Sequence, residues 1–246
     1  MKEQVKINEK ENYIAHSLTG ILDIIICLLL FISSIYKGAF YKSDFLFPNA
    51  VISLVGVIYL VYKIIKEIGS KKDVKAKSKL KILLDTCMLF LPICYALPIV
   101  FKTYVSLPDS IYEMLRYVDM TVIYFIVRDT KNEKLYLNAL VGIAFMQMIL
   151  GIDQLTFRNF ETFLNDISTG YLNDVDRLSA TIQYANVTGI VITLGTVICF
   201  NKITQILKKE GKTKYIELIP LVFVTLLGFF AVTLTKSRVV AVVTLG

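Results

Sequence analysis

The sequence has no tryptophan and only one histidine, His16. Because histidine is the commonest general base and metal ligand, a site built on several imidazoles is excluded. We also find no phosphate-binding glycine loop, zinc signature or nucleophile elbow. The cysteines lie singly in apolar runs, without metal-ligand spacing, at Cys27, Cys87, Cys94 and Cys199. We therefore interpret them as small core residues.

The sequence also lacks the long polar stretches of a soluble domain. Hydrophobic residues make up 55% of its 246 residues, and apolar runs of about 20 residues, the length of a membrane span, recur along it. With tryptophan absent, tyrosines near the ends of these runs supply the interfacial belt. The fold class that we predict is all-α: a polytopic helical membrane protein with one transmembrane domain over residues 1–246.

We predict seven complete membrane-spanning helices. They cover residues 16–36, 49–68, 82–101, 110–127, 135–152, 178–200 and 218–235. A further apolar run starts at Val239 and stops at Gly246, after about a third of the length that a span requires. We therefore expect the start of an eighth span, in a chain that is the N-terminal part of a longer protein.

The basic residues are distributed unevenly between the two sides of the predicted bundle. If the N-terminus is inside, the inner segments hold 18 Lys and Arg residues and the outer segments hold seven. Cytoplasmic loops are enriched in these residues, so we place the N-terminus in the cytoplasm and the protein in the cell membrane. The net charge of +7 is then a topological signal, and no nucleic-acid partner is expected.

Charged side chains inside apolar spans mark ion pairs or functional sites. Asp23 lies in the first predicted span and Asp85 in the third. In the fourth, Glu113, Arg116 and Asp119 are three residues apart, so each neighbours the next on a helix surface. We favour a cluster that neutralises itself inside the bundle over a direct catalytic role.

Polar side chains also recur at four- and three-residue spacing around the start of the sixth predicted span. Arg177, Thr181, Tyr184 and Thr188 follow that spacing, with Asn186 beside them. On a helix they share one face, and a polar face inside a membrane lines a bundle interior or a water-filled cavity. The alternative is an interfacial arginine above hydroxyls that hold helices together.

Two arginines, Arg177 and Arg238, lie at outer ends of the last two complete spans in this topology. The planar guanidinium group matches the oxygens of a phosphate. Two such groups on adjacent span ends would hold a diphosphate at the membrane surface. The alternative is that both are ordinary interfacial residues.

Two short motifs resemble a known family. The run RLSATIQYAN, from Arg177 to Asn186, resembles the signature of the O-antigen ligase and O-antigen polymerase family, in which an arginine is followed by an aromatic or His-Pro pair and then by asparagine and a small residue. The run TKSR, from Thr235 to Arg238, resembles the Thr-x-Ser-Arg of the same family at the outer end of the next span. The order of the motifs, their outer placement and the basic inner loop between them all agree with the family.

The resemblance implies a bacterial glycosyltransferase-type enzyme of cell-envelope polysaccharide biosynthesis. Such enzymes transfer oligosaccharide from an undecaprenyl-diphosphate carrier to a glycan or other acceptor at the outer face of the cytoplasmic membrane, without a nucleotide sugar, cofactor or required metal. It assigns Arg177 and Arg238 to the carrier diphosphate. The residues expected to line the cavity beneath the phosphates are Thr181, Tyr184, Asn186 and Ser237.

The family also has a histidine in a large outer loop after the second arginine, and this sequence ends at Gly246 before any such loop. No catalytic residue is therefore assigned. Among the family's activities we favour the polymerase. The alternatives are an inactive truncated fragment and a transporter or flippase of a lipid-linked glycan. The charged residues that would build a transporter's path are Asp23, Asp85, Glu113, Arg116 and Asp119.

The charge distribution predicts that Ser70 and Thr213 lie in cytoplasmic loops. With each replaced by cysteine in a background without the native cysteines, a membrane-impermeant maleimide should label neither position in intact cells and both after permeabilisation. Labelling of either position from outside would reverse the orientation and move both arginines to the cytoplasmic side.

Overall fold

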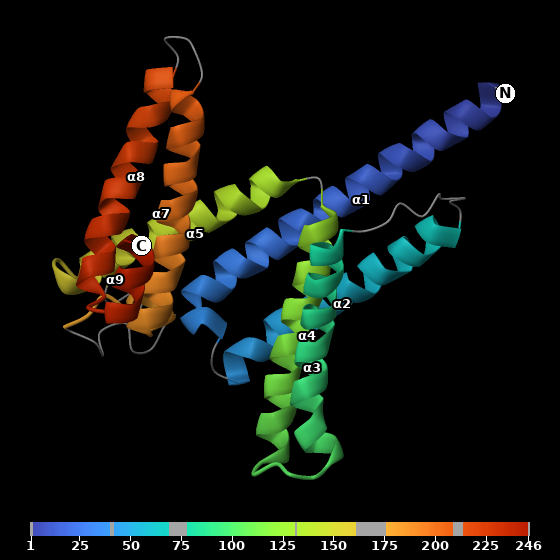
Figure 1. Cartoon of the computed structure of the whole chain (residues 1–246), viewed down its shortest axis with the longest axis horizontal. Helices are drawn as coiled ribbons and strands as arrows, with labels where there is room; N and C mark the ends of the chain where they lie inside the picture. Colours follow the sequence, from blue (N-terminus) through green and yellow to red (C-terminus); the bar gives the residue numbers. More distant parts are fainter. Residues whose placement is uncertain are drawn as a thin grey trace. The chain divides into compact units, whose positions relative to one another are not determined.

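Every regular element in the part of the chain that the structure describes is a helix. The computed structural model describes residues 2–39, 42–68, 78–130, 132–160, 176–208 and 214–245, so the all-α prediction is confirmed for them. The chain divides into two compact units, residues 1–26 with 45–133 (unit 1) and residues 27–44 with 134–246 (unit 2). Unit 1 contains one helical hairpin and unit 2 another (Figure 1).

The helices and their bounds are as follows. The α-helices are α1 (Lys2–Ile35), α2 (Lys42–Ile68), α3 (Lys79–Val100), α4 (Leu107–Asp129), α5 (Glu133–Leu155), α7 (Ala185–Leu207), α8 (Lys214–Leu234) and α9 (Arg238–Leu245). Two short 3₁₀ helices, η1 (Lys37–Ala39) and η2 (Ala180–Ile182), lie in connections.

Five of these helices are long and apolar enough to cross a membrane, namely α2, α3, α5, α7 and α8. This composition indicates a membrane protein. The number is lower than the seven complete spans predicted, because the predicted spans at 16–36 and 110–127 do not qualify by length and composition. In α1 the described apolar part, Thr19–Ile35, is too short, and α4 carries several charged residues along its length.

In unit 1, α3 and α4 form a hairpin whose starts are capped by serines. Ser78 Oγ accepts a hydrogen bond from Lys81 N, and Ser106 Oγ accepts one from Asp109 N. Such caps satisfy backbone N–H groups that have no partner within the helix. The short loop between α3 and α4 then brings the two helices together as antiparallel neighbours.

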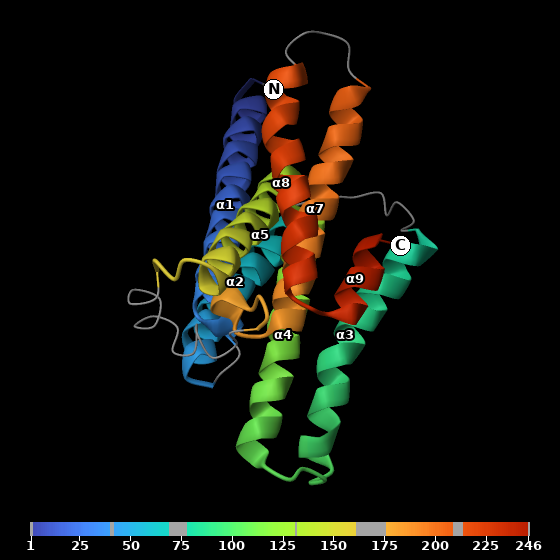
Figure 2. The same cartoon turned by 90° about the vertical axis from the view of Figure 1, so that its left-hand side faces the viewer.

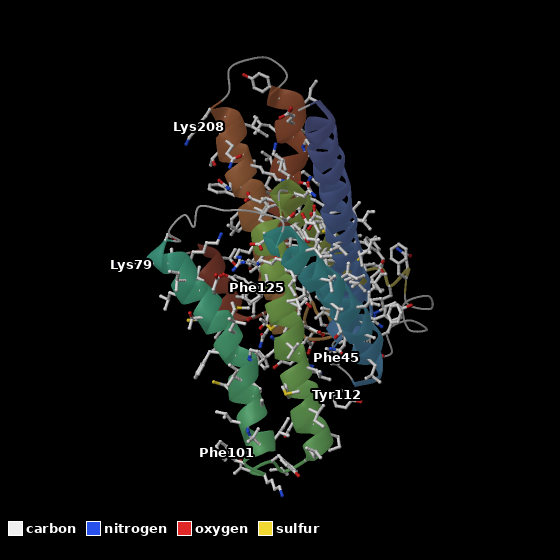
Figure 3. All side chains as sticks on the ribbon, turned by 90° about the vertical axis from the view of Figure 1, so that its right-hand side faces the viewer. Phe45, Lys79, Phe101, Tyr112, Phe125 and Lys208 are labelled. Carbon is white, nitrogen blue, oxygen red and sulfur yellow. The ribbon has the colours of Figure 1, made fainter. Side chains whose placement is uncertain are left out.

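Side chains join the two helices of this hairpin to each other and to α2. The rings of Tyr95 and Tyr117 stack with centroids 3.8 Å apart, and their hydroxyls are hydrogen-bonded at 2.8 Å. Thr121 Oγ1 donates to the carbonyl of Met88 in α3 at 2.9 Å. Phe45 of α2 and Tyr112 of α4 form an edge-to-face pair at 6.3 Å (Figure 3).

The charged cluster of α4 is only partly as predicted. Arg116 pairs with Glu113 at 2.6 Å, but the Glu113 side chain is 46% exposed. Asp119 is instead buried against α2, where Asn49 Nδ2 lies 2.9 Å from both of its carboxylate oxygens. Spacing along α4 alone did not indicate this partner, because the amide comes from another helix.

In unit 2, α7 and α8 form the hairpin, and α9 follows the end of α8 and packs against α7 (Figure 2). Small residues let α5, α7 and α8 approach closely, as is usual between membrane helices. A Cβ atom at Gly195 of α7 would overlap Ala144 of α5, and one at Gly228 of α8 would overlap Thr196 of α7.

The sixth predicted span begins later than expected. Residues 178–184 are not α-helical: they contain η2 and two residues with left-handed backbone, Ala180 (φ 49°) and Gln183 (φ 64°). Helix α7 starts only at Ala185. The polar positions 177, 181, 184 and 188 therefore do not form one helical face, and this expectation was wrong. The physical reason is a set of hydrogen bonds from α5, described with the site below.

Close packing in unit 2 predicts opposite effects at two helical glycines. Gly195→Ala should destabilise the protein by about 1–3 kcal/mol, because the added methyl group meets Ala144 and the carbonyl of Leu140. Gly142→Ala in α5 is the matched control, since nothing lies within 4 Å of its Cβ position, and it should stabilise by up to about 1 kcal/mol. Thermal unfolding in detergent measures both. Equal melting temperatures for the two variants would contradict the packing described.

Candidate functional site

Arg177 connects the two sequence motifs in unit 2. Its Nε donates to the carbonyl of Thr235, and its Nη2 donates to Asn186 Oδ1, both at 3.0 Å. Thr235 follows the last turn of α8, and Asn186 is the second residue of α7. The guanidinium group is therefore held between the end of one hairpin helix and the start of the other.

The charge of Arg177 is not neutralised by these contacts. A carbonyl oxygen and an amide oxygen are neutral acceptors, and among the described residues no carboxylate lies within ion-pair distance of this guanidinium. Of its five N–H donors, two are used by these acceptors. The side chain is half-buried, and its remaining N–H donors have no acceptor among the described residues.

Arg238 lies close to the same place. It is the first residue of α9 and its side chain is exposed. Three peptide units separate it from Thr235, so their Cα atoms are at most about 11 Å apart. The two arginines therefore belong to one end of unit 2.

Ser237 and Thr235 form the turn before α9. Thr235 Oγ1 accepts from Ser237 N at 3.3 Å, and Ser237 Oγ accepts from Val240 N at 3.4 Å. The second bond is the side-chain cap of a helix start. Both residues are buried, so the hydroxyl of Ser237 holds the backbone that carries Arg238.

The other predicted site residues are dispersed. Asn186 contacts Arg177, whereas Thr181 is fully buried and its hydroxyl bonds Ser34 O and Gln147. Tyr184 precedes α7 and is 61% exposed. The structure thus brings together Arg177, Asn186 and the turn before Arg238, and it shows no contact of Thr181 with any of them. That Thr181, Tyr184, Asn186 and Ser237 line one cavity stays a prediction.

Two buried glutamines of α5 were missed by the sequence reasoning. Gln154 Oε1 accepts from the backbone N–H of Ser179 at 3.2 Å and of Ala180 at 2.9 Å, and its Nε2 donates to Ser179 Oγ at 3.0 Å. Gln147 Nε2 donates to Thr181 Oγ1 at 2.8 Å and to Ser34 O at 3.0 Å. The signal was available: two amides seven residues apart share one face of an apolar helix.

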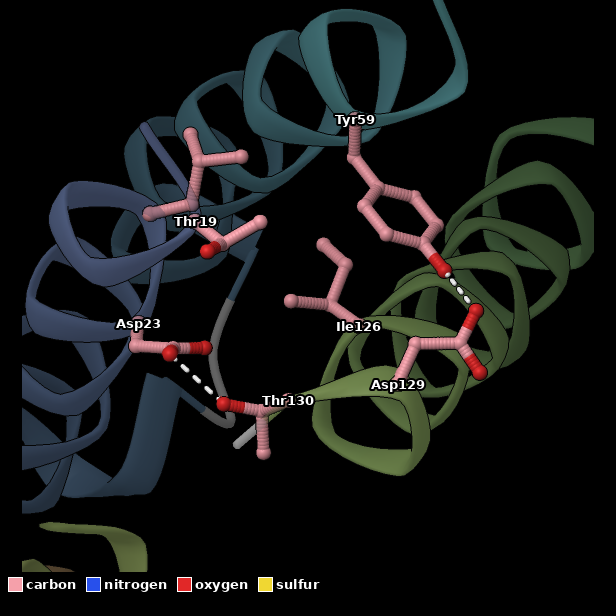
Figure 4. A pocket seen from close by; sticks show the side chains of 7 residues that line it. Thr19, Asp23, Tyr59, Ile126, Asp129 and Thr130 are labelled. Carbon is pink, nitrogen blue, oxygen red and sulfur yellow. Dashed lines mark hydrogen bonds between the residues drawn. The ribbon is translucent and has the colours of Figure 1, made fainter. Parts of the chain in front are cut away.

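Unit 1 contains a small recess near the end of α4, with a volume of about 10 Å³ (Figure 4). Its lining residues are Thr19, Leu22, Asp23, Tyr59, Ile126, Asp129 and Thr130. The carboxylate of Asp23 is buried and accepts from Thr130 Oγ1 at 2.6 Å and from Asn132 Nδ2 at 2.7 Å. Asp23 thereby fixes the chain that leaves α4.

Charged side chains form a network beside this recess. Arg128 pairs with Asp85 of α3 at 2.5 Å and with Asp129 at 2.8 Å, and Lys63 of α2 pairs with Asp129 at 2.9 Å. Tyr59 donates to Asp129 at 2.5 Å. Burial alone would raise the pKa of Asp129, but the hydrogen bonds from Arg128, Tyr59 and Lys63 outweigh it and hold the pKa well below its usual range.

The described residues contain no group of three or more His, Cys, Asp or Glu side chains that would hold a metal ion. The network around Asp129 satisfies its charges internally. It therefore serves to join α2, α3 and α4, whereas the acceptors that Arg177 contacts in unit 2 are neutral oxygens.

The network predicts an acid-dependent stability. Because the pKa of Asp129 is lower in the folded than in the unfolded protein, its contribution is present above about pH 4 and is lost as the pH falls toward the folded value. Asp129→Asn should cost on the order of 1–2 kcal/mol near neutral pH and should weaken the fall in melting temperature below pH 4. Glu133→Gln, at an exposed position, is the control. An unchanged acid dependence in Asp129→Asn would contradict this account.

Comparison with known proteins adds nothing to these observations. No protein-family model, curated protein or solved structure matches the chain. Function must therefore be argued from the residues of the site.

Proposed function

We propose that this protein is a membrane glycan polymerase or ligase. It transfers oligosaccharide from an undecaprenyl-diphosphate carrier to a glycan or other acceptor, as the O-antigen ligase and polymerase family does. The observation that carries the proposal is the pair of 3.0 Å contacts of Arg177 with Thr235 and Asn186. They join the two motifs on which the resemblance depends.

Arg177 and Arg238 bind the carrier diphosphate in this proposal. When the bond between the sugar and the phosphate breaks, negative charge develops on the leaving diphosphate. The two guanidinium groups, of which that of Arg177 is held by its contacts, stabilise that charge, and preorganised cations are among the strongest contributions to catalysis. Arg177 suits this role because its present acceptors are neutral and leave donors for phosphate oxygens.

The topology that fits this role has seven complete spans and a cytoplasmic N-terminus. The excess of basic residues on the inner side supports it. Both arginines then lie at the outer face of the cytoplasmic membrane, where a lipid-linked glycan is polymerised or transferred. Asn186 and Tyr184 shape the surroundings of the phosphates, and Ser237 holds the turn that carries Arg238.

One observation favours a transporter of a lipid-linked glycan as the second candidate. The carboxylates of Asp23 and Asp119 are buried within unit 1, and buried acidic groups in membrane proteins often mark a substrate or ion path. Both accept hydrogen bonds from neutral side chains of neighbouring segments. A transporter would depend on Asp119, whereas the glycan transferase would not.

Arginine-to-lysine variants test the diphosphate site. Undecaprenyl diphosphate binding is measured for the purified chain in nanodiscs of uncharged phosphatidylcholine. Arg177→Lys and Arg238→Lys should each weaken binding by about tenfold or more, because lysine keeps the charge but lacks the planar fork. Asp119→Asn should bind as the unaltered chain does.

Arg158→Lys is the matched control, an arginine on the same predicted side that belongs to neither sequence motif. If the lysine variants at 177 and 238 bind as tightly as this control, both arginines are interfacial anchors and the proposal fails. Failure of the unaltered chain to bind would have the same meaning. Polymer formation from a lipid-diphosphate donor extends the test to catalysis.

A further inference from the structure

The buried amide of Gln154 contacts the segment that follows Arg177. Gln154 is 1% exposed, and Ser179 and Ala180 are as deeply buried. The Gln154 carbonyl oxygen accepts from both of their backbone N–H groups, and its amide donates to Ser179 Oγ. One side chain of α5 thus satisfies three polar groups of a segment whose one backbone bond of α-helical type runs from Gln183 N to Ser179 O.

The chain between Arg177 and Ser179 has little freedom in this arrangement. The N–H of Leu178 donates to the carbonyl of Leu234 at 3.0 Å, and the Leu178 side chain is fully buried. It fits only because residue 151 of α5 is glycine, where a Cβ atom would overlap it. Arg177 is therefore anchored one residue away at Leu178 and two residues away at Ser179.

A helical conformation competes with this one. Residues 178–184 have the polar spacing of a helix, and extending α7 backwards would bond the N–H groups of residues 182–184 within the helix. The observed segment instead contains left-handed backbone at Ala180 and Gln183, which is unfavourable for residues with a side chain. Gln154 offsets that cost, because it supplies the acceptors that the non-helical form needs.

Loss of the acceptor would displace Arg177. Seven residues added to the start of α7 would extend the helix by about 10 Å. The guanidinium could not then keep both of its present contacts, with Thr235 O and Asn186 Oδ1. We infer that Gln154 is a positioning residue for the diphosphate site: it holds residues 178–180 in the conformation that places Arg177 beside the turn before α9. This inference rests on the proposed function.

The experiment is a double-mutant cycle between Gln154 and Arg177. Gln154→Met keeps the volume of the side chain and removes its amide. Dissociation constants for undecaprenyl diphosphate are measured in phosphatidylcholine nanodiscs for the unaltered chain, Gln154→Met, Arg177→Lys and the double variant. Gln154→Met should weaken binding about tenfold in the unaltered chain and by less than about twofold in the Arg177→Lys background, because both changes act through one guanidinium.

Gln147→Met is the matched control, since Gln147 is an equally buried glutamine of α5 that contacts Thr181 further from Arg177. It should weaken binding less than Gln154→Met does. Additive losses in the cycle, or an undiminished affinity in Gln154→Met, overturn the positioning role while the proposed function stands. If the unaltered chain does not bind, the proposed function fails and this inference fails with it. Melting temperatures show whether each variant is folded. If Gln154→Met is unfolded, Gln154→Glu, which keeps the acceptor oxygen, is measured in its place and should retain binding.

Discussion

The hydrogen bonds of Gln154 with the backbone of Ser179 and Ala180 are the interaction on which the organisation of unit 2 depends. Inside a membrane, backbone that is not helical persists only where protein groups or enclosed water satisfy it. A glutamine on α5 supplies those groups here. Gly151 makes room for Leu178 beside it. Hydrogen bonds to buried backbone groups and close packing of an apolar side chain therefore hold the same short segment.

In unit 1, charged side chains near the end of α4 form ion pairs with one another. Its ionic groups near the end of α4 satisfy one another, with Arg128 between Asp85 and Asp129 and with Lys63 on the far side of Asp129. Such a network joins helices but leaves little charge for a ligand. Arg177, whose acceptors are neutral, is the contrasting case, and this difference is the reason to locate a phosphate site in unit 2.

Apolar run length predicted the helices well, because a helix in lipid satisfies its own backbone whatever surrounds it. The predicted spans at 82–101, 135–152 and 218–235 fall within a few residues of α3, α5 and α8. The prediction failed at residues 178–184, where helical spacing of polar residues was present but α5 supplied a competing set of partners. It also missed the Asn49 partner of Asp119. Both depend on contacts between segments far apart in the sequence, which spacing along one segment does not report.

The residues of the candidate site also divide into those that one segment of sequence predicts and those that only contacts between distant segments reveal. The two arginines and Asn186 were found from short motifs, whereas Gln154 and Gln147 lie outside any motif and were recognised only from their contacts.

Carbon-13 chemical shifts of Ala180, Gln183, Ala185 and Thr188, measured by solid-state NMR in lipid bilayers, test the central claim most directly. The account predicts helical shifts for Ala185 and Thr188 and clearly non-helical shifts for Ala180 and Gln183. Helical shifts at all four positions would show that α7 continues back through this segment, and the site as described would not exist.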